Sequence, residues 1–350
     1  MKLDDPYSSN EGFIHTHNTV DFHPKSTGLG WRSIFLRGTM EELRIDKYAK
    51  SVIDFSDIGF ECGCFFNPVG NFSIVPFNGM YLASFRKFAY FITTDIQQYM
   101  FTQNMKLKEP HKQLFCLLDK DFNFVKQLPC VNSSFWEDPE FNNRLPYLED
   151  MRMVQWDGNT YGLSTIFYQG EKGYERIGLE LQQIVVDQET VSCEHRWNSI
   201  PVGIKGIQKN FMSVPDKPFH FIVATFPNGV VMFDMKNNTF TTGGIAEPEK
   251  LIRGNTPLLQ TDFGYMTIAH DLVFDDRKRK RYRNFVVEYN ADLSVRRISR
   301  PFKFTDLNIE FITTFFEDGN DILIGDTIMD DTPLLFRFNR DEFLSEVNRN

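Results

Sequence analysis

The chain of 350 residues is 41% hydrophobic and has a net charge of −9, from 38 basic and 47 acidic residues, so it can bury a large core and is a poor non-specific nucleic-acid binder. No apolar stretch approaches the roughly 20 residues of a membrane helix, and the polar start lacks the apolar segment of a signal peptide. The five cysteines are odd in number and irregularly spaced, which argues against a disulfide framework and predicts a cytoplasmic protein.

The first 60 residues alternate weakly between apolar and polar and are rich in His, Gly and Ser. We interpret residues 1–60 as an N-terminal lead-in that packs on a main domain of residues 61–350. The lead-in contains the pair His15/His17, and the pair Cys62/Cys64 lies at the start of the main domain. A tetrahedral metal site needs a second ligand pair at a legible spacing, and none follows. We therefore expect no metal and no other cofactor.

Five segments of the main domain share one hairpin pattern, in which a polar turn separates two apolar-rich runs. Asn-Gly and Asp-Gly turns between such runs are strong signals for a β-hairpin. The five turns are Asn78-Gly79, Asp157-Gly158, Asp216 to Pro218, Asp262 to Gly264 and Asp318-Gly319. About seven residues after each turn comes a small residue: Ser84, Ser164, Ala224, Ala269 and Gly325.

The small residues are 80, 60, 45 and 56 positions apart, which is a spacing typical of sheets that repeat around an axis. A small side chain at the same register suits a place where several sheets crowd together. Three further strand–turn–strand patterns, at 112–128, 177–192 and 283–298, supply outer strands, and residues 341–350 suit one short helix. The sequence therefore predicts an all-β, five-bladed β-propeller. The alternative is one β-sandwich or a pair of them.

The ends of the five hairpins carry ionisable and amide side chains. The head of the first strand and the tail of the second lie on the same edge of a sheet, and in a propeller these edges surround one mouth of the central channel. For any single residue, a solvated strand end is the simpler interpretation. The whole set in matching register predicts one site, formed by Asn67, Arg86, Glu149, Asp150, Arg152, Lys209, Asn210, Arg253, Asn255, His270, Glu310, Asp326 and Asp330.

Four motifs resemble a known family, one for each of the first four blades. They are "FNPV" at 66–69, "EDMR" at 149–152, "QKN" at 208–210 and "RGNTP", "GY" and "AHD" within 253–271. Over residues 60–340 the chain resembles the five-bladed mannoside phosphorylases of glycoside hydrolase family 130 (GH130) and related glycosyltransferase modules. The resemblance implies that Asn67, Arg152, Lys209 and His270 contact sugar or phosphate. It also implies a proton donor between the first hairpin and the Glu-Asp motif, Asp119 or Asp121, and we prefer Asp121.

The number of cations at the mouth favours a phosphate-bearing substrate over plain hydrolysis. We therefore expect an inverting glycosyltransferase or glycoside phosphorylase that moves a mannose-like hexose between a sugar phosphate or nucleotide-sugar donor and a glycan acceptor. Its catalytic residues are Asp121, Asp150 and Asp326. The substrate-binding residues are Asn67, Arg86, Glu149, Arg152, Lys209, Asn210, Arg253, Asn255, His270 and Asp330.

Three alternatives stay open. A mannosidase or furanosidase could use the same propeller with two carboxylates and a water. A second alternative is a propeller that binds glycans without catalysis. The third is a glycosyltransferase with a nucleic-acid acceptor, which the basic run Arg277 to Arg283 would contact, although such runs in hairpin loops are usually solvated.

Overall fold

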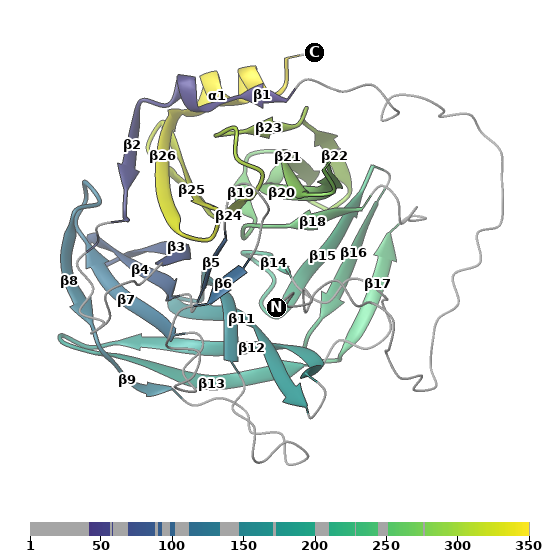
Figure 1. Cartoon of the computed structure of the whole chain (residues 1–350). Coiled ribbons are helices and arrows are strands. Elements are labelled where there is room, and N and C mark those ends of the chain that lie inside the picture. Colours follow the sequence, from purple (N-terminus) through teal and green to yellow (C-terminus); the bar gives the residue numbers. More distant parts are fainter. Residues whose placement is uncertain are drawn as a thin grey trace.

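The computed structural model describes residues 42–56, 58, 69–87, 90–92, 99–101, 112–133, 147–170, 173–199, 210–227, 229–243, 251–275 and 277–349. Most of these residues are in β-strands, and the sheets are arranged in a ring (Figure 1). The predicted site residues Asn67 and Lys209 lie outside the described residues, as do the pairs His15/His17 and Cys62/Cys64. Within the described chain, no helix is long and apolar enough to cross a membrane.

The first two blades are four-stranded antiparallel sheets that follow the chain outward from the centre. Blade 1 consists of β3 (Val69–Phe77), β4 (Met80–Lys87), β7 (Lys112–Leu118) and β8 (Phe124–Leu128). Blade 2 consists of β10 (Tyr147–Trp156), β11 (Asn159–Gly170), β12 (Gly173–Val186) and β13 (Val191–Ser199), and β9 (Cys130–Ser133) adds a parallel edge strand. A separate short hairpin, β5 (Tyr90–Ile92) and β6 (Tyr99–Phe101), lies in the chain between β4 and β7.

Blades 3 and 4 are joined edge to edge where β15 pairs with β18. Blade 3 consists of β14 (Met212–Ser213), β15 (His220–Phe226), β16 (Gly229–Asp234) and β17 (Thr239–Gly243). Blade 4 consists of β18 (Ile252–Gly254), β19 (Leu259–Thr261), β20 (Gly264–Phe274), β21 (Lys280–Asn290), β22 (Val295–Ile298) and β23 (Phe302–Lys303). The short strand β1 (Leu43–Arg44) runs parallel to β23.

Blade 5 closes the ring with strands from both ends of the described chain. Its inner strands are β24 (Glu310–Asp318), β25 (Asp321–Ile328) and β26 (Thr332–Asn339), and β2 (Ser51–Asp54) pairs antiparallel with β26. A 3-10 turn, η1 (Asp46–Tyr48), separates β1 from β2, and the single described helix is α1 (Arg340–Val347). The propeller thus begins before residue 61, because β1 and β2, inside the predicted lead-in, belong to its sheets.

The predicted five-bladed propeller is confirmed. All five predicted turns connect the inner strands of the five blades, and the three predicted outer-strand patterns form β7–β8, β12–β13 and β21–β22. The predicted C-terminal helix is α1, whose first turn is capped by the Asn339 side chain, which accepts the Glu342 backbone N–H at 3.1 Å. Turn chemistry is local, which is why these elements could be located from the sequence.

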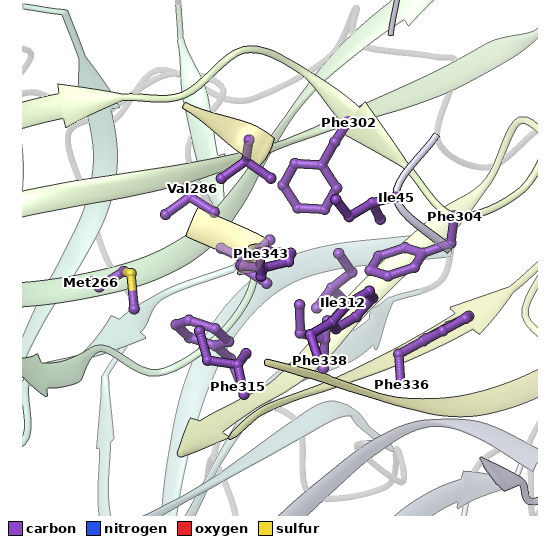
Figure 2. Packing of buried hydrophobic residues seen from close by; sticks show 14 residues of the cluster. Ile45, Met266, Val286, Phe302, Phe304, Ile312, Phe315, Phe336, Phe338 and Phe343 are labelled. Atoms are coloured by element: carbon purple, nitrogen blue, oxygen red, sulfur yellow. The ribbon is translucent and has the colours of Figure 1, made fainter. Parts of the chain in front are cut away.

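The hydrophobic core is divided into five main clusters, one between each pair of neighbouring blades. Both faces of every sheet therefore bury apolar side chains, which accounts for the 36 phenylalanines of the chain. Figure 2 shows the cluster between blades 4 and 5, where Phe302, Phe336 and Phe343 pack with Met266. Each fully buried Phe of this kind contributes about 1.5–3 kcal/mol of burial free energy. The ring is therefore held together by side chains that interlock between sheets.

The predicted small residues lie where the sheets crowd at the centre. Ser84, Ser164, Ala224 and Ala269 are all buried. At Gly325 of β25, a Cβ atom would lie 2.7 Å from the Phe72 ring of blade 1 and 2.7 Å from the Thr314 Cβ atom. No ordinary Cβ contact is that short, so the approach of blade 1 to blade 5 requires glycine at this position.

Candidate active site

One edge of the ring carries both the heads and the tails of the inner hairpins. Gly70 pairs with Arg86, Glu149 with Thr165, and Glu310 with Ile328, each at the end opposite the hairpin turn. We call this edge the mouth edge. The convergence of polar strand ends that the sequence predicted is therefore present in the fold.

Bulges in the inner strands direct polar side chains into the mouth. The register of β3 with β4 shifts between Gly70 and Ser73, and that of β10 with β11 shifts between Glu149 and Arg152. Within these bulges Asn71 has a φ of 41° and Asp150 a φ of 54°, and Asn210 at the head of blade 3 has a φ of 68°. Asn and Asp tolerate this left-handed conformation better than other non-glycine residues. A bulge turns a side chain that would otherwise point between the blades.

The guanidinium of Arg86 joins blade 1 to blade 2 in a buried ionic cluster. It donates to Asp150 Oδ1 at 2.8 Å and to Glu149 Oε1 at 2.7 Å. The side-chain amide of Asn71 donates to the same Asp150 oxygen at 2.7 Å. All four side chains are buried. Buried charges persist only when they are paired and hydrogen-bonded, and this cluster meets that requirement.

Arg152 extends the cluster to blades 3 and 4. Its guanidinium donates to the Asp150 carbonyl oxygen at 3.0 Å, to Asn210 Oδ1 at 3.1 Å and to the Asn255 carbonyl oxygen. Complete burial lowers the pKa of Arg152 to about 10, and the nearby Asp150 charge partly offsets this. The group is still cationic at neutral pH, and the two arginines balance the charges of Glu149 and Asp150.

A chain of hydrogen bonds continues through blade 4 to blade 5. His270 Nδ1 bonds with Asn255 Oδ1, and because an amide oxygen can only accept, Nδ1 carries the proton. The Asn255 amide donates to Asn284 Oδ1 at 3.5 Å, and the Asn284 amide donates to Glu310 Oε2 at 3.4 Å. In neutral His270 the other ring nitrogen, Nε2, is then an acceptor. The network thus connects all five blades.

Two carboxylic acids of blade 5, Glu310 and Asp326, lie at the end of this network. Burial raises the pKa of Glu310 to about 7, against the hydrogen bonds it accepts from Phe304 and Thr305. Asp326 is 0% exposed, and the backbone N–H groups of Phe311 and Thr327 interact with its carboxyl group without forming hydrogen bonds of ordinary geometry. Burial, and next the Glu310 charge, raise the pKa of Asp326 well above its usual value, against these two backbone donors. The surroundings of Asp326 therefore favour its protonated form.

Arg253, at the mouth edge, has no side-chain partner among the described residues. It is half-buried and lies directly opposite His270 in the β18–β20 pairing. Residues that pair across antiparallel strands point to the same face of the sheet. Asp330 lies in the turn that follows β25, next to the mouth edge, with a φ of 60°. Of the predicted residues, Arg86, Glu149, Asp150, Arg152, Asn210, Asn255, His270 and Asp326 lie in or beside the buried network.

Asp121, which the sequence analysis placed at the mouth, does not lie there. It is exposed in the turn between β7 and β8. Leu118 at the end of β7 pairs with Tyr81, which follows the Asn78-Gly79 turn, so the β7–β8 turn lies on the edge opposite the mouth. The physical reason is the alternation of strand direction: β4 runs toward the mouth and β7 runs away from it. Asp119 lies in the same turn, where it caps the N–H groups of Asp121 and Asn123.

Two network residues, Asn71 and Asn284, were missed by the sequence analysis. Asn71 lies near the start of β3, within the segment "GNFSIV", and the apolar residues around it concealed its role. Asn284 follows the basic run and pairs directly with His270. The strand that pairs with β20 is β21. Counting along β21 from the edge of the Asp262 turn toward the mouth would have placed Asn284 beside His270. Within the described residues, no group of three or more His, Cys, Asp or Glu side chains is arranged to hold a metal ion.

The fold and this network define a five-bladed β-propeller with an ionic site at its axis. The solved structure of β-1,2-mannobiose phosphorylase from Listeria innocua with β-1,2-mannobiose is similar, with a TM-score of 0.52 at 11% identity over 86% of this chain and 100% of that chain. A putative glycosidase from Bacteroides thetaiotaomicron has a TM-score of 0.53 at 11% identity, over 78% of this chain and 87% of that one.

A third similar structure comes from the GH130 family of mannoside phosphorylases, which contains glycoside hydrolases that target β-1,2-mannosidic linkages in Candida mannan. Its TM-score is 0.52 at 9% identity, over 79% of this chain and 85% of that chain. The chain is therefore structurally similar to the GH130 propellers, as its motifs predicted. No family model matches the sequence, and no curated protein is similar to it in sequence.

Proposed function

We propose that this protein is an inverting glycoside phosphorylase that acts on a mannose-like β-glycoside. In this reaction inorganic phosphate displaces a sugar from the anomeric carbon of its neighbour and yields a sugar 1-phosphate. The structurally similar Listeria innocua protein is a β-1,2-mannobiose phosphorylase. The site has the two parts that such a reaction needs, a carboxylic acid whose pKa is raised, Asp326, and a cation that is not already neutralised, Arg253.

The observation that carries the proposal is the state of Asp326. A general acid must hold its proton at neutral pH and must reach the leaving oxygen. Asp326 is completely buried beside Glu310, which raises its pKa, and no described residue offers its oxygens a hydrogen bond of ordinary geometry. Leaving a buried carboxyl with only the poorly aligned backbone donors of Phe311 and Thr327 costs free energy, which a fold retains where a ligand supplies a better partner. A glycosidic oxygen or a sugar hydroxyl would be such a partner.

The chemical step follows from these positions. A phosphate oxygen attacks the anomeric carbon from the face opposite the leaving group, and the bond from that carbon to the glycosidic oxygen breaks. The leaving oxygen takes the proton of Asp326, so that the products are a sugar 1-phosphate of inverted configuration and a free sugar. The Asp326 carboxylate then recovers a proton from water. Only one carboxylic acid is needed, because phosphate is the nucleophile.

Arg253 and His270 are the best candidates to hold the phosphate. They lie opposite one another on paired strands and point to the same face. The guanidinium fork of an arginine suits the oxygens of a phosphate, and no described side chain occupies that of Arg253. The network residues Arg86 and Arg152 position the site, and their guanidinium groups donate to carboxylate and carbonyl oxygens of the protein.

The bonding of Arg86 and Arg152 to oxygens of the protein supports a second candidate function, glycoside hydrolysis. The sequence analysis assigned Arg86 and Arg152 to the substrate, yet Glu149 and Asp150 already neutralise Arg86. With fewer cations available for phosphate, two carboxyl groups and a water would suffice for an inverting hydrolase. The GH130 family contains such hydrolases, which keeps this candidate in view.

A product assay separates the two candidates. The purified protein is incubated with a panel of β-mannosides and other β-hexosides, with and without inorganic phosphate, and the products are separated by anion-exchange chromatography. The proposal predicts a sugar 1-phosphate that forms only with phosphate present and is lost in Asp326→Asn. Free sugar at the same rate with or without phosphate would replace phosphorolysis by hydrolysis. Absence of any product from the whole panel would contradict both.

A further inference from the structure

The hairpin of β20 and β21 extends beyond the mouth edge of blade 4. Its pairing continues past the network from His270↔Asn284 for four more pairs, ending at Phe274↔Lys280. At about 3.4 Å per residue, this part of the hairpin reaches on the order of 14 Å beyond His270. We call the described residues 274, 275 and 277–280 the hairpin tip. The basic run that the sequence analysis singled out lies in this tip and in the strand that follows it.

The backbone of the tip is fixed by Asp275. Its Oδ1 atom accepts the N–H groups of Arg277 and Arg279 at 2.9 Å each, and its Oδ2 atom accepts Arg279 Nε at 2.7 Å. Lys278 has a φ of 59° and donates its N–H to the Asp275 carbonyl oxygen at 2.8 Å. The Arg277 and Lys278 side chains are exposed and have no side-chain partner within the described structure. The turn thus presents two cations on a preformed backbone.

An aromatic side chain lies beside these cations. Phe274 is 62% exposed, more than any other aromatic residue for which exposure is described. It lies opposite Lys280, and alternate pairs of a β-hairpin point to one face, so Leu272 and Tyr282 follow on the same side. The Tyr282 ring lies 4.8 Å from the His270 ring, centroid to centroid. One face of the hairpin therefore leads from an aromatic and cationic tip to the buried site.

The local charge is opposite to that of the whole chain. Six of the seven residues 277–283 are basic, in a chain with a net charge of −9. Arg279 pairs with Asp275, Arg281 with Glu42 and Arg283 with Asp271, whereas Arg277 and Lys278 are exposed to solvent. The exposed positive charge of the run is therefore concentrated at the tip, where it attracts a polyanion.

The exposed Phe274 decides which polyanion fits best. A sulfated or carboxylated polysaccharide needs only the cations, whereas a single strand of nucleic acid offers phosphates to cations and bases to an aromatic ring. Bases that stack on an aromatic side chain contribute about 1–3 kcal/mol each, whatever their sequence. We propose that the hairpin tip binds single-stranded nucleic acid, with Arg277 and Lys278 on the phosphates and Phe274 under a base. This binding is independent of the proposed phosphorylase activity.

Fluorescence anisotropy with a labelled oligothymidylate tests the proposal on the full-length protein over a range of salt concentrations. Two phosphate contacts predict a slope of log K against log salt of about −1.4. The double variant Arg277→Gln/Lys278→Gln should bring this slope close to zero. Phe274→Ala should weaken binding by roughly 5- to 150-fold and leave the slope unchanged. Because these three residues are exposed, the variants should fold as the wild type does.

The matched control lies on other blades, away from the tip. Lys236→Gln/Arg196→Gln removes two exposed cations, Lys236 over the Phe219 ring and Arg196 beside the half-exposed Glu194, and should leave oligothymidylate binding unchanged. No binding at low salt, or equal losses in the tip variant and the control, would overturn the proposal. Binding of heparin with no binding of oligothymidylate would overturn it too. A failure here leaves the phosphorolysis assay unaffected, because that assay contains no nucleic acid.

Discussion

Arg86 of blade 1 donates to Asp150 of blade 2 across the boundary between the blades, at a distance of 2.8 Å and with both side chains buried. The same guanidinium reaches Glu149, the residue before Asp150. The "EDMR" motif thus has a structural role, because its two acids hold the cation of the neighbouring blade. Its arginine, Arg152, connects in turn to blades 3 and 4.

Removing the Arg86 guanidinium should be severely destabilising. Arg86→Met leaves Glu149 and Asp150 buried without their cation, which costs about 3–5 kcal/mol in the free energy of unfolding. Urea denaturation measures the loss. The control is Arg196→Met, which breaks the half-exposed pair with Glu194 and should cost no more than about 1 kcal/mol. Similar losses in both variants would show that the buried pair does not hold the blades together.

Gly325 should tolerate no larger residue. In Gly325→Ala the new Cβ atom meets the Phe72 ring at 2.7 Å, which should cost about 1–3 kcal/mol or more through overpacking. Phe72→Leu in the same chain should relieve part of this cost, so that the double variant is more stable than the sum of the single variants predicts. The two single variants and the double variant are compared by urea denaturation. Strict additivity would show that the two residues do not press on each other.

The Glu310–Asp326 pair should make stability depend on pH. The pKa of Glu310 is raised from 4.5 to about 7, so the folded protein keeps a proton that the unfolded chain releases between these values. This stabilisation is complete below about pH 4.5 and is lost as the pH rises through 7, a loss of about 3 kcal/mol at 1.36 kcal/mol per pKa unit. The raised pKa of Asp326 acts in the same direction.

Urea denaturation between about pH 5 and pH 8 measures this dependence. Glu310→Gln/Asp326→Asn should flatten the fall of stability with pH, because neither amide titrates. Glu189→Gln, which removes an exposed carboxylate, is the control and should follow the wild type. A double variant with the same slope as the wild type would mean that the two acids are not held protonated in the fold.

If Arg253 binds phosphate, its loss should be seen in phosphate saturation. Arg253→Gln should raise the KM for phosphate by roughly 10- to 100-fold, the effect of one charge-assisted contact of about 1.5–3 kcal/mol. The KM for the glycoside should change little. Initial rates at varied phosphate and fixed glycoside measure the effect. An unchanged phosphate KM would remove Arg253 from the phosphate site.

Much of the fold could be predicted because turn chemistry is local. The Asn78-Gly79 and Asp157-Gly158 turns fix the register of their hairpins, and counting outward from them placed Arg86 and Glu149 at one edge. Their contact could not be predicted, since it depends on the twist and stagger of two separate sheets. Asp121 was misplaced because the resemblance gave only its interval in the chain. Its edge could have been inferred from strand direction, because the β7–β8 turn is the second reversal after the Asn78-Gly79 turn and so returns to the same edge.

The central claim is that Asp326 supplies the proton for phosphate-dependent glycoside cleavage at the mouth of the propeller. Phosphorus NMR of the protein with β-1,2-mannobiose and inorganic phosphate tests this claim most directly, because it follows substrate and product phosphate in one sample. The account predicts that a single sugar 1-phosphate signal grows as the phosphate signal falls, in the wild type and in Asp121→Asn, whereas Asp326→Asn leaves the phosphate signal unchanged. Turnover by Asp326→Asn at the wild-type rate would contradict it.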